Sequence, residues 1–142
     1  MSMRRILVGV DGSEPSLKAA RLATEIAIRF GARLTLAYVV PRLVLPPDAY
    51  GLTMVEVEEE HRAFGEKTLA EAMTKLGESG VEVEPLVLAG PPAESLAEAA
   101  TAPDIDLVVV GSRGRAAVAR VLLGSVTDRL VHISTKPVLV SH

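Results

Sequence analysis

Five short apolar segments alternate with longer segments of helical periodicity, and this alternation constrains the fold more than any other feature of the chain. The apolar segments span residues 6–10, 34–40, 81–88, 107–110 and 137–140. Strands that alternate with amphipathic helices are typical of an α/β fold, in which right-handed crossovers place helices on both faces of a parallel sheet. Because 142 residues are the usual size of one domain, we expect a single domain over the chain.

The composition of the strands predicts their order. Segments 6–10 and 107–110 are apolar at nearly every position, which predicts burial on both faces at the centre of the sheet. Segment 81–88 contains Pro85, which cannot donate to a strand ladder, so we place it at an edge. The sequence therefore predicts an open, doubly wound, five-stranded parallel sheet in the order 3-2-1-4-5. In such a sheet ligands bind beyond the carboxyl ends of the strands where the winding reverses, here between the first and fourth strands.

Four amphipathic helices are expected between these strands. Ser13 and Gly31 have the residue types of an N-cap and a C-terminal stop for the first helix. The second helix is predicted over residues 52–76, and the third is short and begins at Pro92. The fourth carries apolar residues at helical spacing between positions 118 and 130.

Composition excludes several classes of function. The chain has no cysteine, which removes disulfides, thiolate metal sites and a thiol nucleophile. Aromatic residues make up only 3%, whereas single-stranded nucleic acids bind on aromatic platforms, and a net charge of −3 gives no general attraction to nucleic acid or anionic membranes. The apolar segments are too short to span a membrane, and the N-terminus lacks the apolar region of a signal peptide. We expect a soluble, cytoplasmic protein that binds neither nucleic acid nor membrane.

Two glycine turns follow the fourth strand. Gly111-Ser112-Arg113-Gly114 is separated by nine residues from Gly124-Ser125-Val126-Thr127. Glycines let an anion approach backbone N–H groups closely, and the hydroxyls of Ser125 and Thr127 add donors. The N–H groups around Gly124 to Val126 are expected to open a helix, where the helix dipole favours phosphate. The spacing predicts that the two turns bind a polyphosphate between them. Alternatively, the first turn only connects a strand to a helix and Gly124 is a tolerated helix glycine.

An acidic residue, Asp11, follows the first strand on the other side of the predicted crevice. Its carboxylate suits hydrogen bonds to ribose hydroxyls or to a metal held by phosphates. Alternatively, Asp11 organises the turn before the first helix, which aspartate often does. The chain has neither a G-x-x-x-x-G-K-[ST] motif nor a G-x-G-x-x-G motif, so a P-loop and a dinucleotide fingerprint are both absent.

The pattern G-x2-G-x9-G-[ST] at Gly111, Gly114, Gly124 and Ser125 resembles that of the universal stress protein family, specifically its ATP-binding branch. The likeness extends over the whole chain, from the first strand and the turn after it to the closing strand at residues 136–140. The resemblance implies a fold like that of the adenine-nucleotide alpha-hydrolases.

The resemblance also implies roles for individual residues. Asp11, Gly9 and the backbone of Val39 would contact the nucleoside of ATP, while Mg²⁺ or Mn²⁺ would be held through the phosphates. Arg113 and Arg115 are charged candidates for phosphate contacts, or alternatively loop residues that face solvent. The remaining phosphate-binding positions implied are Gly111, Ser112, Gly114, Ala116, Ala117, Gly124, Ser125, Val126 and Thr127.

The last strand is expected at an edge of the sheet, where an uncovered apolar strand promotes aggregation unless it is paired. We therefore predict a homodimer in which Val138, Leu139 and Val140 pair across a two-fold axis, as the resemblance also implies. Alternatively, the edge is unpaired and protected by Lys136.

The predicted function is that of an ATP-binding regulatory or scaffold protein of the stress response, with a protein partner that the sequence does not identify. No catalytic residue is assigned, and hydrolysis is expected to be slow at most, because the motif places no histidine or lysine to activate water or stabilise charge. The alternatives are a genuine ATP-hydrolysing or nucleotidyl-transferring enzyme of related architecture and a structural dimer without nucleotide.

Overall fold

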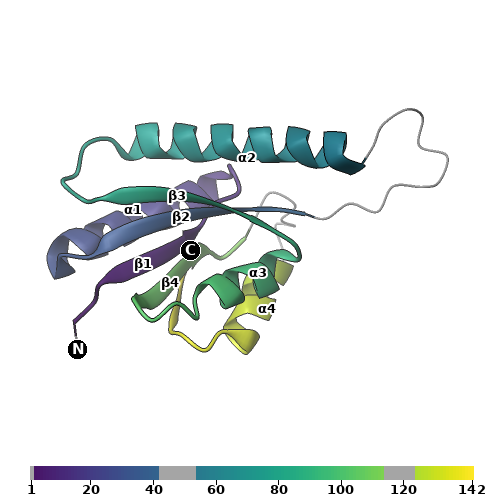
Figure 1. Ribbon diagram of the computed structural model, residues 1–142. Helices are drawn as coiled ribbons and strands as arrows, with labels where there is room; N and C mark the ends of the chain where they lie inside the picture. Colours follow the sequence, from purple (N-terminus) through teal and green to yellow (C-terminus); the bar gives the residue numbers. More distant parts are fainter. Residues whose placement is uncertain (1, 42–53, 114–123) are drawn as a thin grey trace.

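A computed structural model describes residues 2–41, 54–113 and 124–142. Its five strands form one parallel sheet in the order β3-β2-β1-β4-β5, which confirms the predicted topology (Figure 1). The strands are β1 (Arg5–Gly9), β2 (Arg33–Val40), β3 (Val83–Ala89), β4 (Ile105–Gly111) and β5 (Val138–Ser141). The helices are α1 (Glu14–Phe30), α2 (Met54–Leu76), α3 (Pro92–Ala99) and α4 (Ser125–Ile133).

Burial follows the predicted arrangement of central and edge strands. In β1 the side chains of Ile6, Leu7 and Val8 have no exposed surface, because β2 and β4 flank the strand and helices cover both faces. Pro85 lies in the edge strand β3, in register with Leu36 of β2. A proline is tolerated there because the outer side of an edge strand needs no ladder donor.

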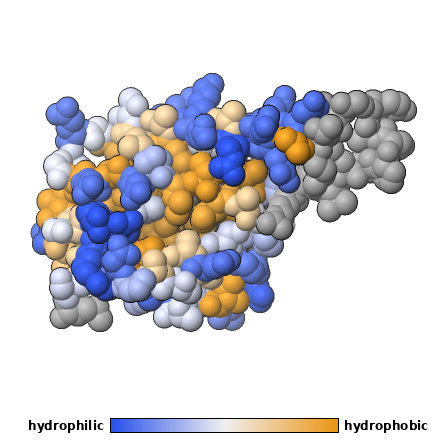
Figure 2. Space-filling model, viewed as in Figure 1, coloured by the Kyte–Doolittle hydropathy of each residue, from blue (hydrophilic) through white to orange (hydrophobic). Residues whose placement is uncertain are grey.

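The helices form one layer on each face of the sheet. Side chains of α1 and α2 pack with one face of the strands in one apolar cluster, and side chains of α3 and α4 pack with the other face in a second cluster (Figure 1). Figure 2 shows apolar side chains across the middle of the same view, in the region of β3, below the largely hydrophilic outer side of α2. The winding thus reverses between β1 and β4, and their carboxyl ends are neighbours in the sheet.

The ends of α1 agree with the sequence prediction. Ser13 is the N-cap, and its side chain accepts a hydrogen bond from the backbone N–H of Ser16. Gly31 follows the last helical residue in a left-handed conformation (φ 67°), which glycine adopts without steric cost. α3 begins at Pro92 as predicted, and the described part of the second predicted helix is α2.

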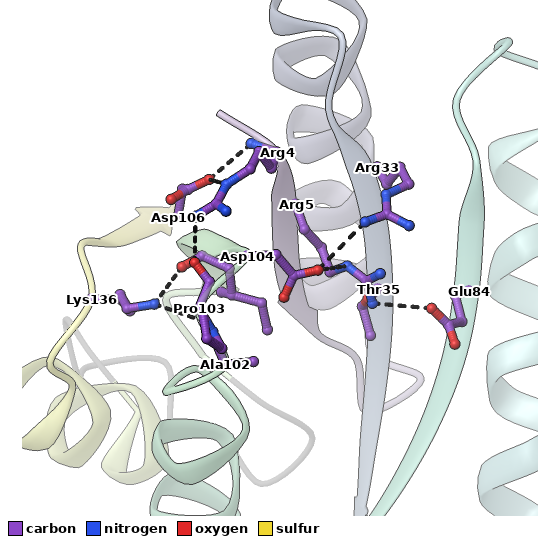
Figure 3. A network of polar contacts seen from close by, with 11 residues as sticks. Arg4, Arg5, Arg33, Thr35, Glu84, Ala102, Pro103, Asp104, Asp106 and Lys136 are labelled. Carbon is purple, nitrogen blue, oxygen red and sulfur yellow. Dashed lines mark hydrogen bonds and ion pairs between the residues drawn. The ribbon is translucent and has the colours of Figure 1, made fainter. Parts of the chain in front are cut away.

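The amino-terminal ends of the strands are joined by a network of ion pairs, shown in Figure 3. Arg5 of β1 contacts Asp104 at 2.9 Å and Glu84 of β3 at 3.1 Å, while Arg33 of β2 contacts the same aspartate at 3.4 Å. On the other side of Arg5, Asp106 of β4 accepts a hydrogen bond from the backbone N–H of Arg4 at 2.8 Å. These ion pairs therefore join neighbouring strands at the amino edge, which is opposite to the carboxyl ends where the ligand site is predicted.

No helix in the part of the chain that the structure describes combines the length and the apolar character that a membrane crossing requires.

Candidate functional site

The turn after β1 is held by hydrogen bonds among Asp11, Ser13 and Ser16. Asp11 Oδ1 accepts from the backbone N–H and from the hydroxyl of Ser13, at 2.9 and 2.5 Å. The buried Ser16 hydroxyl donates to the Ser13 carbonyl at 2.9 Å and accepts from the backbone N–H of Asp11 at 3.3 Å. Asp11 thus helps to organise the turn, and the same contacts fix one oxygen of its carboxylate. Its contact with a ligand stays a prediction.

Ser16 is a component of this turn that the sequence analysis missed. It lies three residues after the N-cap Ser13, where a polar side chain can bond back to the start of a helix. That spacing was the available signal. The sequence could not indicate that Ser16 is also buried and reaches the backbone of Asp11.

The structure distinguishes two predictions for the start of the last helix. The apolar spacing predicted helical residues on both sides of Gly124, whereas the phosphate prediction had a helix begin around Gly124 to Val126. α4 begins at Ser125 and Gly124 is its N-cap, with φ −68° and ψ 158°, which agrees with the second prediction and corrects the first. Positions 118–122 of the first prediction lie outside the described residues. Because glycine in a helix interior costs about 1 kcal/mol relative to alanine, a start just after Gly124 is favoured over a helix that continues through it.

The first backbone N–H groups of α4 have no acceptor within the helix. Gly124 makes no side-chain cap, and the first intrahelical bond runs from the N–H of Asp128 to the carbonyl of Gly124 at 2.9 Å. The N–H groups of Ser125, Val126 and Thr127 therefore have no partner within the helix. Ser125 and Val126 are exposed, so this turn is open to solvent at its first two residues.

Two hydrogen bonds fix this turn beside the end of β4, and a third joins the end of β4 to β5. The backbone N–H of Gly124 donates to the Ser112 carbonyl at 2.6 Å, and the Ser112 N–H donates to the Ser141 carbonyl at the end of β5 at 2.8 Å. The buried Thr127 hydroxyl donates to the Gly111 carbonyl at 2.7 Å. The structure thus brings together Gly111, Ser112, Gly124 and Thr127, which the sequence analysis had placed in one site.

The contact of Thr127 limits what its side chain can do. A hydroxyl carries one hydrogen, and here that hydrogen is donated to Gly111, so the side chain cannot donate to an anion while the bond stands. Of the two hydroxyl donors that the sequence predicted, Ser125 is exposed and Thr127 is engaged. Thr127 can offer an anion its backbone N–H, and its side chain positions the helix.

Gly111 has a packing role that involves no ligand. A Cβ atom at this position would lie 2.9 Å from the carbonyl carbon and oxygen of Pro15, in the first turn of α1. The close approach also shows that the first turn of α1, which follows the turn of Asp11, lies against the end of β4. The two halves of the predicted crevice therefore meet at the carboxyl edge of the sheet.

The other predicted site residues lie around this junction or outside the described residues. Gly9 ends β1, where a Cβ would be 3.2 Å from side-chain atoms of Leu96 and Val110, and Val39 packs partly buried against the same cluster on the α3–α4 face. Arg113 is half-buried at the end of β4. The predictions that lie outside the described residues are those for Gly114, Arg115, Ala116 and Ala117.

A hollow of about 150 Å³ between α1 and α2 was not predicted from the sequence. Gly12 and Ser13 form part of its wall, and Phe64, Lys67 and Glu71 of α2 face them across it. The hollow arises from the packing of two helices, which no local sequence pattern encodes. Among the residues that the structure describes, no group of three or more histidine and acidic side chains gathers where it could hold a metal ion.

The fold and the junction of β1, β4 and α4 place the chain among the open, doubly wound α/β proteins, in which ligands bind at the carboxyl edge of the sheet. The model of the universal stress protein family matches residues 3–142. A universal stress protein of Methanocaldococcus jannaschii is 34% identical over 140 residues, which cover 96% of this chain and 81% of that relative. The chain belongs to the universal stress protein family.

Solved structures of the family have the same fold. The universal stress protein UspA from Lactobacillus plantarum superposes with a TM-score of 0.88 at 27% identity, over 100% of this chain and 99% of that one. A universal stress protein determined in complex with cAMP gives a TM-score of 0.70 at 29% identity, over 100% and 98% of the two chains.

Proposed function

We propose that this universal stress protein binds ATP at the carboxyl ends of β1 and β4 and acts as a nucleotide-dependent regulatory or scaffold protein in the stress response. The related structure in complex with cAMP supports an adenine nucleotide as the class of ligand. The end of β1, the end of β4 and the start of α4 meet at this edge, which supports its location.

The observation that carries the proposal is the amino-terminal turn of α4, which has a glycine N-cap and is fixed to the end of β4. Helix N-termini attract anions because their N–H groups are unpaired and the helix dipole is positive there. At α1 the side chain of Ser13 already caps the helix, whereas Gly124 has no side chain to do so at α4. The phosphates would accept hydrogen bonds from the N–H groups of Ser125, Val126 and Thr127 and from the Ser125 hydroxyl.

The nucleoside would lie beside the end of β1. In this proposal Asp11 accepts a hydrogen bond from the sugar, and Gly9 and the backbone of Val39 border the base. Carboxylate oxygens only accept hydrogen bonds, and ribose hydroxyls donate them, so the two groups are complementary.

A divalent cation would be held chiefly by the phosphates. Mg²⁺ keeps several waters and is commonly bound through one or two carboxylates together with substrate phosphates. One carboxylate, Asp11, follows β1, and the described residues gather no larger acidic group, which fits a cation that arrives with the nucleotide. When bound, Mg²⁺ or Mn²⁺ would neutralise phosphate charge.

Replacement of Ser125 by proline tests the location of the phosphates. Proline is favoured at the first position of a helix, and it removes the N–H and the hydroxyl of residue 125 without breaking an intrahelical bond. The backbone of Gly124 (φ −68°, ψ 158°) already has the conformation required before proline. We expect S125P to weaken Mg-ATP binding by about tenfold or more in calorimetry, since a hydrogen bond to a charged group contributes roughly 1.5–3 kcal/mol.

The matched control is S125A, which removes only the hydroxyl and should lose less affinity than S125P. Both variants should keep the far-ultraviolet circular dichroism and the unfolding midpoint of the parent. If S125P binds Mg-ATP as tightly as the parent does, the phosphates do not lie at α4.

Two measurements separate this proposal from its rivals. Mass spectrometry of the gently purified protein would detect co-purifying ATP, which excludes a structural dimer without nucleotide. Steady turnover of ATP that is lost in D11N would favour an ATP-hydrolysing enzyme instead of a nucleotide-dependent regulator.

A further inference from the structure

We propose that Ser13 is a positioning residue that orients the Asp11 carboxylate and thereby makes the site distinguish ribose from deoxyribose. This inference rests on the proposed function, because it assigns the sugar specificity of the nucleotide site. It concerns a side chain that is not itself among the predicted ligand-binding residues.

The contacts of Ser13 restrain the carboxylate from two directions. Its N–H and its hydroxyl both donate to the same oxygen, Asp11 Oδ1, at 2.9 and 2.5 Å. Two donors on one oxygen hold the carboxylate more tightly than one donor does. Asp11 itself is half-buried, so its rotation is also limited by the surrounding chain.

The Ser13 hydroxyl is itself held by α1. Its oxygen accepts from the backbone N–H of Ser16 at 3.3 Å, so its hydrogen is directed away from the helix, toward Asp11. The cap of α1 and the orientation of the carboxylate are thus two functions of one hydroxyl group. Rigid secondary structure positions a polar group more precisely than a loop does, and here α1 provides it.

A fixed acceptor gives sugar specificity by a simple mechanism. A ribose hydroxyl donates to the carboxylate, whereas a deoxyribose analogue leaves the oriented acceptor without that donor. Sites built to hydrogen-bond a hydroxyl reject analogues that lack it, because the polar group of the site is then left unpaired. A carboxylate that is held less tightly would adjust more easily to either sugar and discriminate less between them.

The substitution S13G isolates the hydroxyl. Glycine is an acceptable N-cap that costs only a few tenths of a kcal/mol relative to serine, and the backbone N–H of residue 13 remains to donate to Asp11. S13T keeps a hydroxyl and a good cap, so it should restore the behaviour of the parent.

S16A is the matched control. It removes a buried hydroxyl from the same turn, but that hydroxyl contacts the backbone of Asp11 and Ser13 and not the carboxylate. If the turn acts only as a structural unit, S16A and S13G should change nucleotide binding in the same way.

The experiment measures calorimetric affinities of the full chain for Mg-ATP, Mg-2′-deoxy-ATP and Mg-3′-deoxy-ATP. We expect the parent, S13T and S16A to prefer ATP over at least one deoxy analogue by about tenfold or more, and S13G by less than about threefold. The loss in S13G should come from weaker binding of ATP, with the affinity for the deoxy analogue nearly unchanged.

Several outcomes would overturn the inference, and they are distinguishable. If the parent binds none of the three nucleotides, the proposed function fails and this inference fails with it. If the parent binds ATP but S13G keeps the preference of the parent, or loses all three nucleotides equally while folded, only the role of Ser13 is refuted. A parent that binds ATP and both deoxy analogues equally also refutes it.

Discussion

Gly111 is suited to its position for two reasons that the sequence pattern does not separate: a predicted phosphate turn and close packing against α1. The glycine belongs to a spacing that predicts a phosphate turn, yet Pro15 of α1 occupies the space that a side chain would need. At Gly9, at the end of the neighbouring strand, the atoms nearest to a Cβ would be side-chain atoms of Leu96 and Val110, at 3.2 Å. The two glycines therefore differ in how much the surrounding structure can yield.

The comparison of G111A with G9A tests this difference. In G111A the new Cβ would meet backbone atoms of Pro15, which cannot move without shifting α1, and we expect a loss of unfolding free energy of about 1–3 kcal/mol. G9A should lose clearly less, because side chains can change rotamer. Urea denaturation of the parent and both variants measures the two losses of unfolding free energy. Equal stability of G111A and the parent would show that α1 adjusts freely and that packing does not require this glycine.

At the scale of whole elements, the sequence predicted the architecture well where the signals were local. The apolar segments predicted which strands lie at the centre of the sheet, and Pro85 predicted one edge strand. Ser13 and Gly31 predicted the two ends of α1. The signal for α4 was also local, but the apolar spacing ran across Gly124, and periodicity alone does not mark an N-cap.

Contacts between elements were beyond the reach of local patterns. Tyr38 of β2 lies against α2 at Gly65, where a Cβ would be 2.5 Å from its ring, and Phe64 meets the same ring edge-on at a centroid distance of 6.1 Å. No local pattern in the sequence indicates that Tyr38 lies against Gly65 and Phe64. The hollow between α1 and α2 was missed for the same reason, since it depends on how far apart two helices pack. The sequence offered Asp11 as an organiser of the turn before α1, but it did not predict the hydrogen bonds to Ser13 and Ser16.

The contact between Tyr38 and Gly65 predicts a reversal of an ordinary helix effect. Glycine to alanine in a helix interior normally stabilises by about 1 kcal/mol. G65A should instead destabilise by about 1–3 kcal/mol, because the new methyl group collides with the buried ring of Tyr38. In a Y38A background the collision is absent, so the same substitution should stabilise. A double-mutant cycle of urea unfolding measures both signs, and a stabilising G65A in the parent chain would contradict the contact.

At the scale of the whole molecule, the two edges of the sheet have different chemistry. The amino edge is joined by charged side chains from several strands (Figure 3). The carboxyl edge instead carries the turn of Asp11 and the first N–H groups of α4, which have no acceptor within the helix. At the amino edge Lys136, which precedes β5, donates to the carbonyls of Ala102 and Ile105 at 3.0 and 2.5 Å. Ion pairs therefore tie the strands together at the end of the sheet away from the proposed site.

Two carboxyl groups with lowered pKa values predict how the stability of the molecule depends on pH. The backbone N–H of Arg4, with further contributions from the Arg4 side chain and from Lys136, holds the pKa of Asp106 below its ordinary value. The hydrogen bond from Arg129 likewise lowers the pKa of Glu94. A carboxyl group whose pKa is lowered by folding stabilises the fold above its unfolded pKa, and this contribution is lost as the pH falls through the lower, folded value.

We therefore expect the urea midpoint to fall as the pH drops below about 4, where aspartate and glutamate titrate in the unfolded chain. The variant D106N cannot ionise at this position, so its midpoint should fall less steeply in that range and should be lower than that of the parent at pH 7. An identical pH dependence in D106N and the parent would show that Asp106 makes no such contribution.

The two outer strands predict how copies of the chain associate. We propose that β5 pairs with its counterpart in a second copy. β5 is short, its residues Val138, Leu139 and Val140 are half-buried, and no strand among the described residues pairs with its outer edge. β3 is the matched internal control, since its outer edge carries Pro85 and exposed Glu84, which oppose pairing. Sedimentation should give a dimer at micromolar concentration. Amide hydrogen exchange at residues 138–141 should accelerate on dilution, while exchange in β3 stays constant. A monomer at micromolar concentration, or equal changes in both strands, would contradict pairing through β5.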